Sequence, residues 1–369
     1  MSTKQATPEG TSRHLSQRPH QFNPHKIRSF DGLTLSAMAA GTYLGASDDA
    51  TDHLYEEALV HAAQHGINFF DTAINYRCQR SERNIAYALH KLIGTGITRD
   101  QIFISTKGGF LPADGDPNSY KEYIYKCYLN TGIMVPDDIV EHCHCMTPKY
   151  LQSQIDLSLK NLKCGSIDLY YLHNPETQLR AVNESDFYKR LRSAFELLEK
   201  NVADEKIRRY GVATWNGFRQ GFGAPDRLDL EKIIAIAREV GGANHNLKAI
   251  QLPYNLAMLE AVGVPSQKVA EDELPIIPAA VHHGVAVMIS APLMQANVLR
   301  LPQAVYGQIA GNESSIQKAL NFVLSSPGVT SAMVGMKQIK HVDENRHVLT
   351  LPDWDVPTLQ AIAGMVVES

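Results

Sequence analysis

The feature of this sequence that most constrains its fold is a repeated alternation of short apolar runs with amphipathic helical segments. Eight such pairs follow one another between Leu35 and Leu349 without a break in composition. Strands that alternate with helices predict a parallel sheet, and eight units close naturally into a (β/α)8 barrel. A doubly wound open sheet is the second choice, disfavoured because no Gly-x-Gly-x-x-Gly follows the first apolar run.

Three segments lie outside this repeat. An Asp-Gly pair at Asp31 predicts an N-terminal β-hairpin, a long loop over 108–146 follows the third strand, and an extra helix over 357–367 ends the chain. The loop follows a strand carboxyl end, which makes it the best candidate for a substrate lid. We expect 1–25 to be a disordered extension and 26–369 to be a single barrel domain. The predicted strands are 35–40, 67–70, 102–106, 167–172, 209–213, 249–252, 286–290 and 331–334.

Four chemically active side chains stand at the ends of consecutive predicted strands. Asp71 ends the second strand and Tyr76 follows five residues later, Lys107 follows the third strand, and His173 follows the fourth. Alone, each has an ordinary structural explanation, such as a helix cap, a loop aromatic or a solvated strand end. The carboxyl ends of barrel strands meet at one face, where the active sites of such barrels lie. Together, the four residues therefore predict an active site.

This set of residues matches the needs of carbonyl reduction. No side chain donates hydride, so a nicotinamide must be bound. Tyr76 is the candidate proton donor, and a nearby Lys107 ammonium is expected to lower the pKa of its phenol. Asp71 would hold the lysine, and His173 would orient the carbonyl oxygen by a hydrogen bond.

Three of these segments resemble the signature strands of the aldo-keto reductases: 66–76, 105–107 and 168–173, in this order. The resemblance extends from about Leu33 to Asn345. It implies a (β/α)8 barrel that reduces an aldehyde or ketone with NADPH, in which Tyr76, Lys107, Asp71 and His173 are catalytic. The segment 335–345 resembles the part of the family that binds the adenosine phosphate, where Lys337 and His341 favour NADP(H), with NADH as the alternative.

The resemblance also implies the other cofactor-binding residues. Gln251 would hold the nicotinamide amide, and Pro292 and Leu293 would line the pyrophosphate. The sequence departs from the family pattern at Ser290, where an aromatic residue usually stacks on the nicotinamide, and at His341, where arginine is frequent. The complete implied set is Gly41, Thr42, Tyr43, Asp71, Thr214, Gln251, Ser290, Pro292, Leu293, Gly335, Lys337, His341, Glu344 and Asn345.

Other readings of the sequence remain open. The alternative function is a nucleotide-binding regulatory or redox-sensing barrel with little turnover, in which Cys78 is a candidate for oxidation. The run Glu141-His-Cys-His-Cys145 suggests a metal, and a metal hydrolase is a third reading. The histidines and cysteines of this run alternate without spacer residues, so adjacent side chains would point to opposite sides of the chain, and we expect no metal site. Trp215 and Tyr254 are candidate pocket walls.

The composition and charge of the chain limit which binding partners and which cellular compartment we expect. A net charge of −4 and a pI of about 6.4 give no reason to expect nucleic acid or anionic membranes as partners. No run approaches the roughly 20 apolar residues of a membrane span. Five cysteines in 369 residues do not form a disulfide framework, and the polar N-terminus lacks the apolar core of a secretory signal. We expect a cytoplasmic protein whose partner is a small carbonyl compound, and the sequence says nothing about its oligomeric state.

Overall fold

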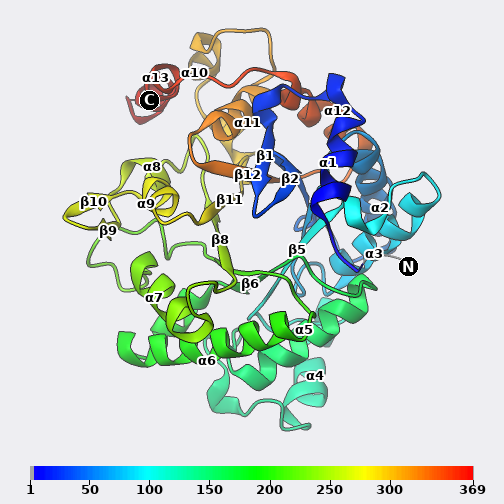
Figure 1. Ribbon diagram of the computed structural model, residues 1–369, viewed down its shortest axis with the longest axis vertical. Coiled ribbons are helices and arrows are strands. Elements are labelled where there is room, and N and C mark those ends of the chain that lie inside the picture. Colours follow the sequence, from blue (N-terminus) through cyan, green and yellow to red (C-terminus); the bar gives the residue numbers. More distant parts are fainter. Residues whose placement is uncertain (1–3, 369) are drawn as a thin grey trace.

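The computed structural model describes residues 4–368 and confirms the predicted (β/α)8 barrel (Figure 1). Eight strands close on themselves in the order β11-β12-β3-β4-β5-β6-β7-β8, and all neighbouring pairs are parallel. The first predicted strand is wrong at its start, because Leu35 belongs to the N-terminal hairpin. The strands are β3 (Met38–Gly41), β4 (Phe69–Asp71), β5 (Phe103–Gly108), β6 (Leu169–His173), β7 (Tyr210–Ala213), β8 (Leu247–Pro253), β11 (Ala286–Ser290) and β12 (Val329–Gly335).

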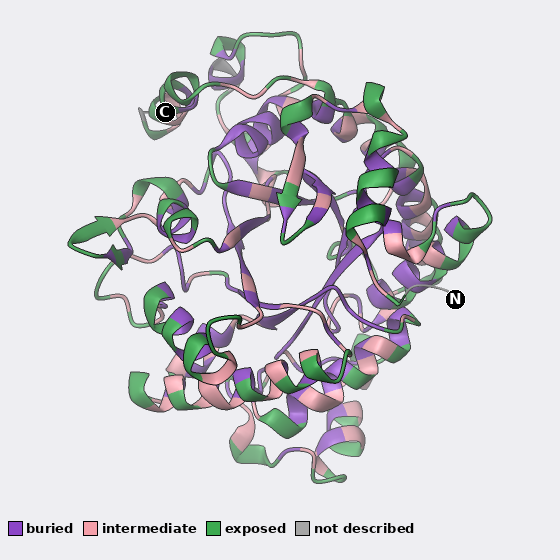
Figure 2. Cartoon of the chain, viewed as in Figure 1, coloured by how far each residue is buried: buried purple, intermediate pink, exposed green. Residues whose placement is uncertain are grey.

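A ring of helices surrounds the strands. Figure 2 shows that these helices are buried on the side facing the barrel and exposed on the outer side. Some of their N-termini are capped by local side chains: the Asp48 carboxylate accepts a hydrogen bond from the Thr51 amide, and Ser314 forms a capping box with Gln317. The helices are α2 (Asp49–Gln64), α3 (Arg80–Ile93), α5 (Pro148–Leu162), α6 (Glu184–Ala203), α7 (Leu230–Gly241), α9 (Ile276–His282), α11 (Ser315–Ser325) and α12 (Ile339–Arg346).

The core has two layers, which explains the continuously apolar strands. One layer fills the barrel interior with large side chains such as Phe69, Phe103 and Met288, and the other lies between the strands and the helices. A strand packed on both faces has no solvent side and therefore shows no alternation. The predicted hairpin, β1 (Ile27–Phe30) and β2 (Leu33–Ser36), contributes to the interior layer and is confirmed.

The prediction that 1–25 is disordered is wrong for the residues that the structure describes, and residues 1–3 lie outside them. Helix α1 (Pro8–Ser16) is capped by the Thr7 side chain and buries His14 and Leu15. The Ala6 amide donates to the Asp168 carboxylate at 2.8 Å, at the end of the barrel opposite the pocket described below. The segment is polar overall, so no apolar run in its sequence indicates a helix, and contacts with distant residues supply its stability.

The loop over 108–146 is an ordered insertion rather than an open lid. It contains α4 (Tyr120–Ile124) and a π-helical turn (Tyr125–Leu129), and Figure 1 shows α4 beyond the ring of helices, away from the barrel axis. Its apolar side chains form a separate small core. The members of this core are Leu111, Ile124, Tyr128, Met134, Cys145 and Tyr150.

Smaller insertions follow other strands. The loop after β8 contains α8 (Glu260–Gly263) and the hairpin of β9 (Gln267–Val269) and β10 (Asp272–Leu274), which the sequence pattern did not reveal. The loop after β11 contains α10 (Gln303–Gln308), which contacts the predicted C-terminal helix, α13 (Val356–Glu368). Short 3-10 turns lie at Pro19–Gln21, Pro24–Lys26, Arg99–Gln101, Pro117–Ser119, Pro136–Asp138, Pro175–Arg180, Met294–Arg300 and His347–Thr350.

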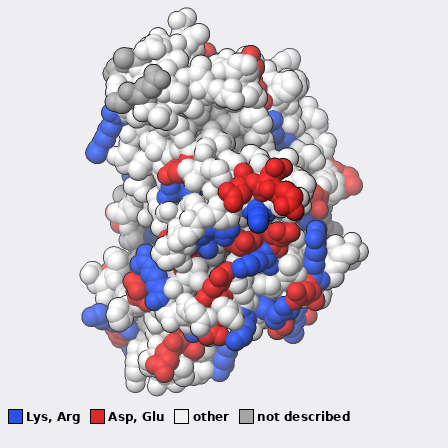
Figure 3. Space-filling view, turned by 90° about the vertical axis from the view of Figure 1, so that its left-hand side faces the viewer, with Lys and Arg blue, Asp and Glu red and all other residues white. Residues whose placement is uncertain are grey.

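The surface carries charges of both signs. On the face shown in Figure 3, acidic and basic side chains are intermingled over much of the area. Exposed ion pairs such as Lys232–Glu184, at 2.6 Å, are of the kind that contributes little to stability. Within the described part of the chain, no helix combines the length and the apolar character that crossing a bilayer requires.

Candidate active site

A cavity of about 740 Å³ opens at the carboxyl ends of the barrel strands. The final residues of β3, β4, β6, β7, β11 and β12 all line it, so residues far apart in sequence meet at one mouth. Every predicted site residue lines this cavity except Lys107, which is buried behind it, and Lys337. The predicted residues that do so are Gly41, Thr42, Tyr43, Asp71, Tyr76, His173, Thr214, Gln251, Ser290, Pro292, Leu293, Gly335, His341, Glu344 and Asn345.

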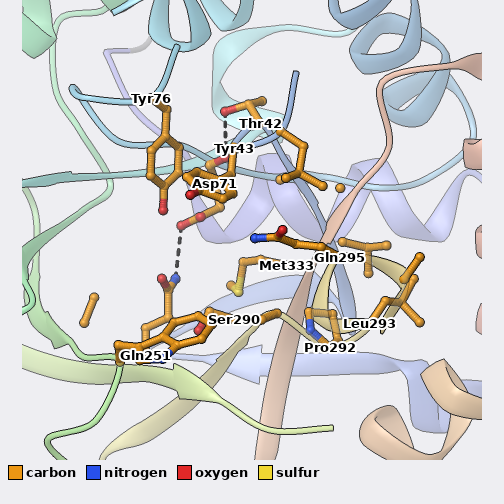
Figure 4. A pocket seen from close by; sticks show the side chains of 18 of the residues that line it. Thr42, Tyr43, Asp71, Tyr76, Gln251, Ser290, Pro292, Leu293, Gln295 and Met333 are labelled. Carbon is orange, nitrogen blue, oxygen red and sulfur yellow. Dashed lines mark hydrogen bonds between the residues drawn. The ribbon is translucent and has the colours of Figure 1, made fainter. Parts of the chain in front are cut away.

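Asp71 is the polar centre of the cavity floor. Its carboxylate accepts hydrogen bonds from Lys107 Nζ at 2.7 Å and Ser105 Oγ at 2.6 Å. It also accepts one from Gln251 Nε2 at 3.1 Å, which Figure 4 shows. Lys107 Nζ also donates to the carbonyl of Thr72 at 2.8 Å. Both members of the ion pair are buried. Ser105 comes from β5, which pairs with β4, and Gln251 comes from β8 across the barrel. The expected pairing of Asp71 with Lys107 is present.

Tyr76 lies directly above this pair. Its ring centroid is 5.0 Å from Lys107 Nζ, and Figure 4 shows its hydroxyl pointing into the cavity. Burial raises the pKa of Tyr76 well above 10, and the Asp71 carboxylate and Tyr43 raise it further. The expected net lowering of this pKa is therefore wrong: burial and the Asp71 charge outweigh the attraction of the Lys107 ammonium, which faces the ring. The phenol keeps its proton at neutral pH, as a proton donor must.

His173 stands on the other side of Tyr76. Their ring centroids are 5.8 Å apart, and the ring of Phe110 packs edge-on against His173 at 4.9 Å. Burial lowers the pKa of His173 well below 6.5, and the charge of Lys107 and the neighbouring His144 add to this shift. The imidazole is therefore neutral. A neutral imidazole has one N–H and can donate one hydrogen bond to an oxygen in the cavity.

The remaining wall carries polar atoms that lack partners. Thr214 Oγ1 and Asn75 Oδ1 are buried without a hydrogen bond inside the described chain. Buried polar atoms are rarely left unpaired in folded proteins. Both residues line the cavity, so a polar ligand such as a carboxamide would satisfy them. The residues present thus fit a polar planar ligand at this position.

At the far end of the cavity, α12 and α11 are joined through Glu344. Ser314 Oγ donates to the Glu344 carboxylate at 3.2 Å, and Gln317 Nε2 donates to its backbone carbonyl at 2.9 Å. His341 and Asn345 line the cavity beside it, as expected. Lys337 lies on the preceding turn and does not line the cavity.

Several lining residues escaped the sequence analysis. Gln295 and Ala296 belong to the loop after β11 and have φ angles of 55° and 66°, which local sequence did not suggest because neither is glycine. Figure 4 shows the Gln295 amide pointing into the cavity. Trp215 lines the rim as expected, whereas Tyr254 does not: it is buried and shares a hydrogen bond with Ser326 at 3.0 Å.

The segment 141–145 divides between two environments. Glu141 and His142 are exposed whereas His144 and Cys145 are buried, so the run divides along its length and burial does not alternate from one residue to the next. In residues 4–368, no group of three or more His, Cys, Asp or Glu side chains is arranged to hold a metal ion. Of the whole 108–146 insertion, Phe110 is the residue that lines the cavity, so the expected role as a lid is not what the packing favours.

Comparison with curated proteins finds distant relatives. A D-threo-aldose 1-dehydrogenase from Pseudomonas sp. is 29% identical over 191 residues, covering 50% of this chain and 51% of that protein. A probable voltage-gated potassium channel subunit beta from Arabidopsis thaliana is 24% identical over 204 residues, covering 54% of this chain and 49% of that protein. The chain thus spans about half the length of the curated relatives it matches.

Solved structures share the whole fold. An aldo/keto reductase from Klebsiella pneumoniae in complex with NADP and acetate is 21% identical, with a TM-score of 0.61 and coverage of 92% of this chain and 95% of that one. An aldo-keto reductase from Bacillus halodurans in its holo form is 18% identical, with a TM-score of 0.64 and coverage of 92% and 96%. At these identities the likeness concerns the fold.

A family model decides membership. The model of the aldo/keto reductase family matches residues 37–301, a range that begins just before β3 and ends beyond β11. It covers more than half of the chain and includes Asp71, Tyr76, Lys107 and His173. The chain therefore belongs to the aldo/keto reductase family.

Proposed function

We propose that this protein reduces an aldehyde or ketone to an alcohol with NADPH, and that Tyr76 donates the proton. The observation that carries the proposal is the convergence of the Tyr76 phenol and the neutral His173 imidazole on one cavity, above the buried pair of Lys107 and Asp71. One group can give a proton and the other can hold the oxygen that receives it.

Each of the four residues would have its own role in the reaction. The His173 N–H binds the carbonyl oxygen and sets it beside the Tyr76 hydroxyl, which transfers its proton as negative charge develops on that oxygen. The phenolate left behind is stabilised by the Lys107 ammonium, 5.0 Å from the ring centroid. Asp71 has three donors and stays in place during this change. The reverse oxidation of an alcohol uses the same groups.

The cofactor assignment rests on this chain's residues and on the family. When bound, a nicotinamide supplies the hydride. Thr214 and Gln251 would hold its carboxamide, because Thr214 Oγ1 has no hydrogen-bond partner among residues 4–368 and Gln251 reaches the cavity floor. Lys337 and His341, with Glu344 and Asn345, would meet the adenosine end, which favours NADP(H) over NAD(H). The Klebsiella pneumoniae relative is described in complex with NADP, which agrees with this choice.

The test is NADPH consumption with a panel of aldehydes and ketones. Tyr76→Phe removes the proton donor and keeps the ring, so we expect turnover to be lost while NADPH binding, followed by fluorescence, persists. Tyr87→Phe is the matched control, because this phenol is exposed on α3 and does not line the cavity. It should retain most of the activity.

Two results would contradict the proposal. Unchanged turnover in Tyr76→Phe would remove this residue as the proton donor. Tight NADPH binding without reduction of any carbonyl would favour a nucleotide-binding regulatory or redox-sensing barrel, a reading in keeping with the absence of an aromatic side chain at Ser290.

A further inference from the structure

We propose that His144, carried by the 108–146 insertion, is a positioning residue that holds His173 in its working orientation. The proposal rests on the carbonyl reductase function above, in which His173 orients the substrate oxygen. It gives the insertion a role as a brace behind the active site in place of a lid over it.

The contact between the two histidines is direct. His144 is 1% exposed, and its Nε2 lies 2.8 Å from the backbone carbonyl of His173. Its Nδ1 accepts a hydrogen bond from Gln178 Nε2 at 2.8 Å. Since Nδ1 is an acceptor, the ring proton lies on Nε2 and is donated to the His173 carbonyl. Arg190 in turn holds the Gln178 carbonyl oxygen, which fixes the orientation of that amide.

The charge state of His144 agrees with this pattern. Burial lowers the pKa of His144 to about 4, although its bond to His173 opposes the shift. The imidazole is therefore neutral at neutral pH. A neutral ring has one donor and one acceptor, and both are used here, so a proton or a different partner would break the chain of bonds.

The backbone of the insertion is built around this contact. At its neck, the Leu111 amide donates to the Cys143 carbonyl at 2.8 Å and the Cys145 amide donates to the Gly109 carbonyl at 2.9 Å. Gly109 has a φ of 139°, and a Cβ there would lie 2.8 Å from His144 Nε2 and 2.9 Å from the His173 carbonyl oxygen. Only glycine lets the strand pass this close to the bond.

His173 needs such support because its own ring is poorly anchored. His173 Nδ1 is buried without a partner inside the described chain, so no hydrogen bond behind the ring sets its direction. Its orientation depends on its backbone and on two ring contacts, with Tyr76 at 5.8 Å and Phe110 at 4.9 Å. The Phe110 ring packs equally against His144, at 5.3 Å. His144 thus controls both the backbone of His173 and one wall of its ring.

The insertion is rigid enough to act as a brace. The Tyr150 hydroxyl donates to the Phe110 carbonyl at 2.9 Å, and the rings of Tyr150 and Tyr128 pack at 5.2 Å within the small separate core. The same insertion also binds the loop after Tyr76, where the Gly115 amide donates to the Cys78 carbonyl at 2.9 Å. The insertion therefore contacts the backbone close to Tyr76 and that of His173, the two residues proposed to act on the carbonyl.

The experiment compares three variants in the full-length protein. His144→Leu removes both hydrogen bonds at similar size, and His144→Gln restores a donor at the position of Nε2. His142→Leu is the matched control, because His142 is exposed and lies two residues away. The readouts are kcat and KM for the carbonyl, the Kd for NADPH, the unfolding temperature, and the ¹⁵N signals of the His173 ring, assigned with His173→Gln.

We expect His144→Leu to lower kcat on the order of 10²-fold, because displacing a catalytic group by about 1 Å produces a loss of this size. The Kd for NADPH should change little, the His173 ring signals should shift, and His144→Gln should recover much of both. A purely stabilising role would lower the unfolding temperature and leave kcat at low temperature and the His173 signals unchanged, which would overturn the proposal. A different result is that the wild-type protein reduces no carbonyl while His144→Leu still shifts the His173 ring signals. That result would overturn the reductase function and support the contact between the two histidines.

Discussion

Replacing Lys107 by methionine should destabilise this protein and stop its turnover, for one physical reason. Lys107 and Asp71 form a 2.7 Å ion pair in which the side chains are 1% and 5% exposed. Methionine keeps the length and removes the charge. Asp71 would retain the donors from Ser105 and Gln251 but would face no cation, and the Thr72 carbonyl would lose its donor. Removing one partner of a buried pair costs about 3–5 kcal/mol of unfolding free energy.

A second buried pair provides the matched control. Arg99 and Asp168 also lie 2.7 Å apart, with side chains that are 10% and 0% exposed, at the end of the barrel opposite the cavity. Asp168 would keep the amide donors of Ala6 and Ile104. Arg99→Met should therefore cost a similar unfolding free energy and leave turnover nearly intact.

The assay is urea unfolding followed by circular dichroism, with NADPH consumption measured below the transition. The double variant Asp71→Asn with Lys107→Met removes both charges, so it should be clearly more stable than the sum of the two single losses predicts. Additive losses, or an unfolding midpoint of Lys107→Met equal to that of the wild type, would refute the reasoning that an unpaired buried carboxylate causes the cost.

Two further changes test groups behind the cavity: Glu176, whose carboxylate accepts the backbone amides of Trp215 and Asn216, and Gly109. Burial raises the pKa of Glu176 from 4.5 to about 7, so the folded state holds this proton more tightly than the unfolded state does. The bound proton therefore stabilises the fold fully below about pH 4.5. This stabilisation is lost as the pH rises to about 7, by about 1.4 kcal/mol of unfolding free energy per pH unit. Glu176→Gln should flatten this slope in unfolding experiments from pH 4.5 to 7, and an unchanged slope would assign it to another group. Gly109→Ala should lower both the unfolding temperature and kcat, because the new Cβ meets the bond between His144 and His173, whereas Gly263→Ala, with open space around it, should change neither.

Much of the fold was readable because its signals are local. The eight strands and their helices follow from periodicity within windows of a few residues, and the strand β11 was predicted with its observed bounds. The hairpin turn at Asp31 and Gly32 was equally clear, and both residues have positive φ. The order of the elements then determined which strand ends share a face, so Asp71, Tyr76, Lys107 and His173 could be grouped from the sequence alone.

Elements held by distant contacts were not readable in this way. Helix α1 is polar overall, so no apolar run marks it. Its order depends on contacts that the helix and the residue Ala6 before it make with Asp100 and Asp168, about 90 to 160 residues away. The small separate core of the 108–146 insertion likewise joins residues with no common period. Such contacts carry no pattern in a short window, so loops and extensions were where prediction failed.

The sequence by itself determined the barrel, the face that carries the chemistry and the identity of the four residues proposed to act there, because strand order and residue type are properties of the chain. Only the tertiary structure decided how those groups are tuned. Burial reversed the expected direction for the pKa of Tyr76, since burial and the Asp71 charge outweigh the attraction of the Lys107 ammonium, which faces the ring. It also brought His144 to the backbone of His173 across 29 residues. Burial and directional contacts depend on what surrounds a side chain, and that exists only once the chain has folded.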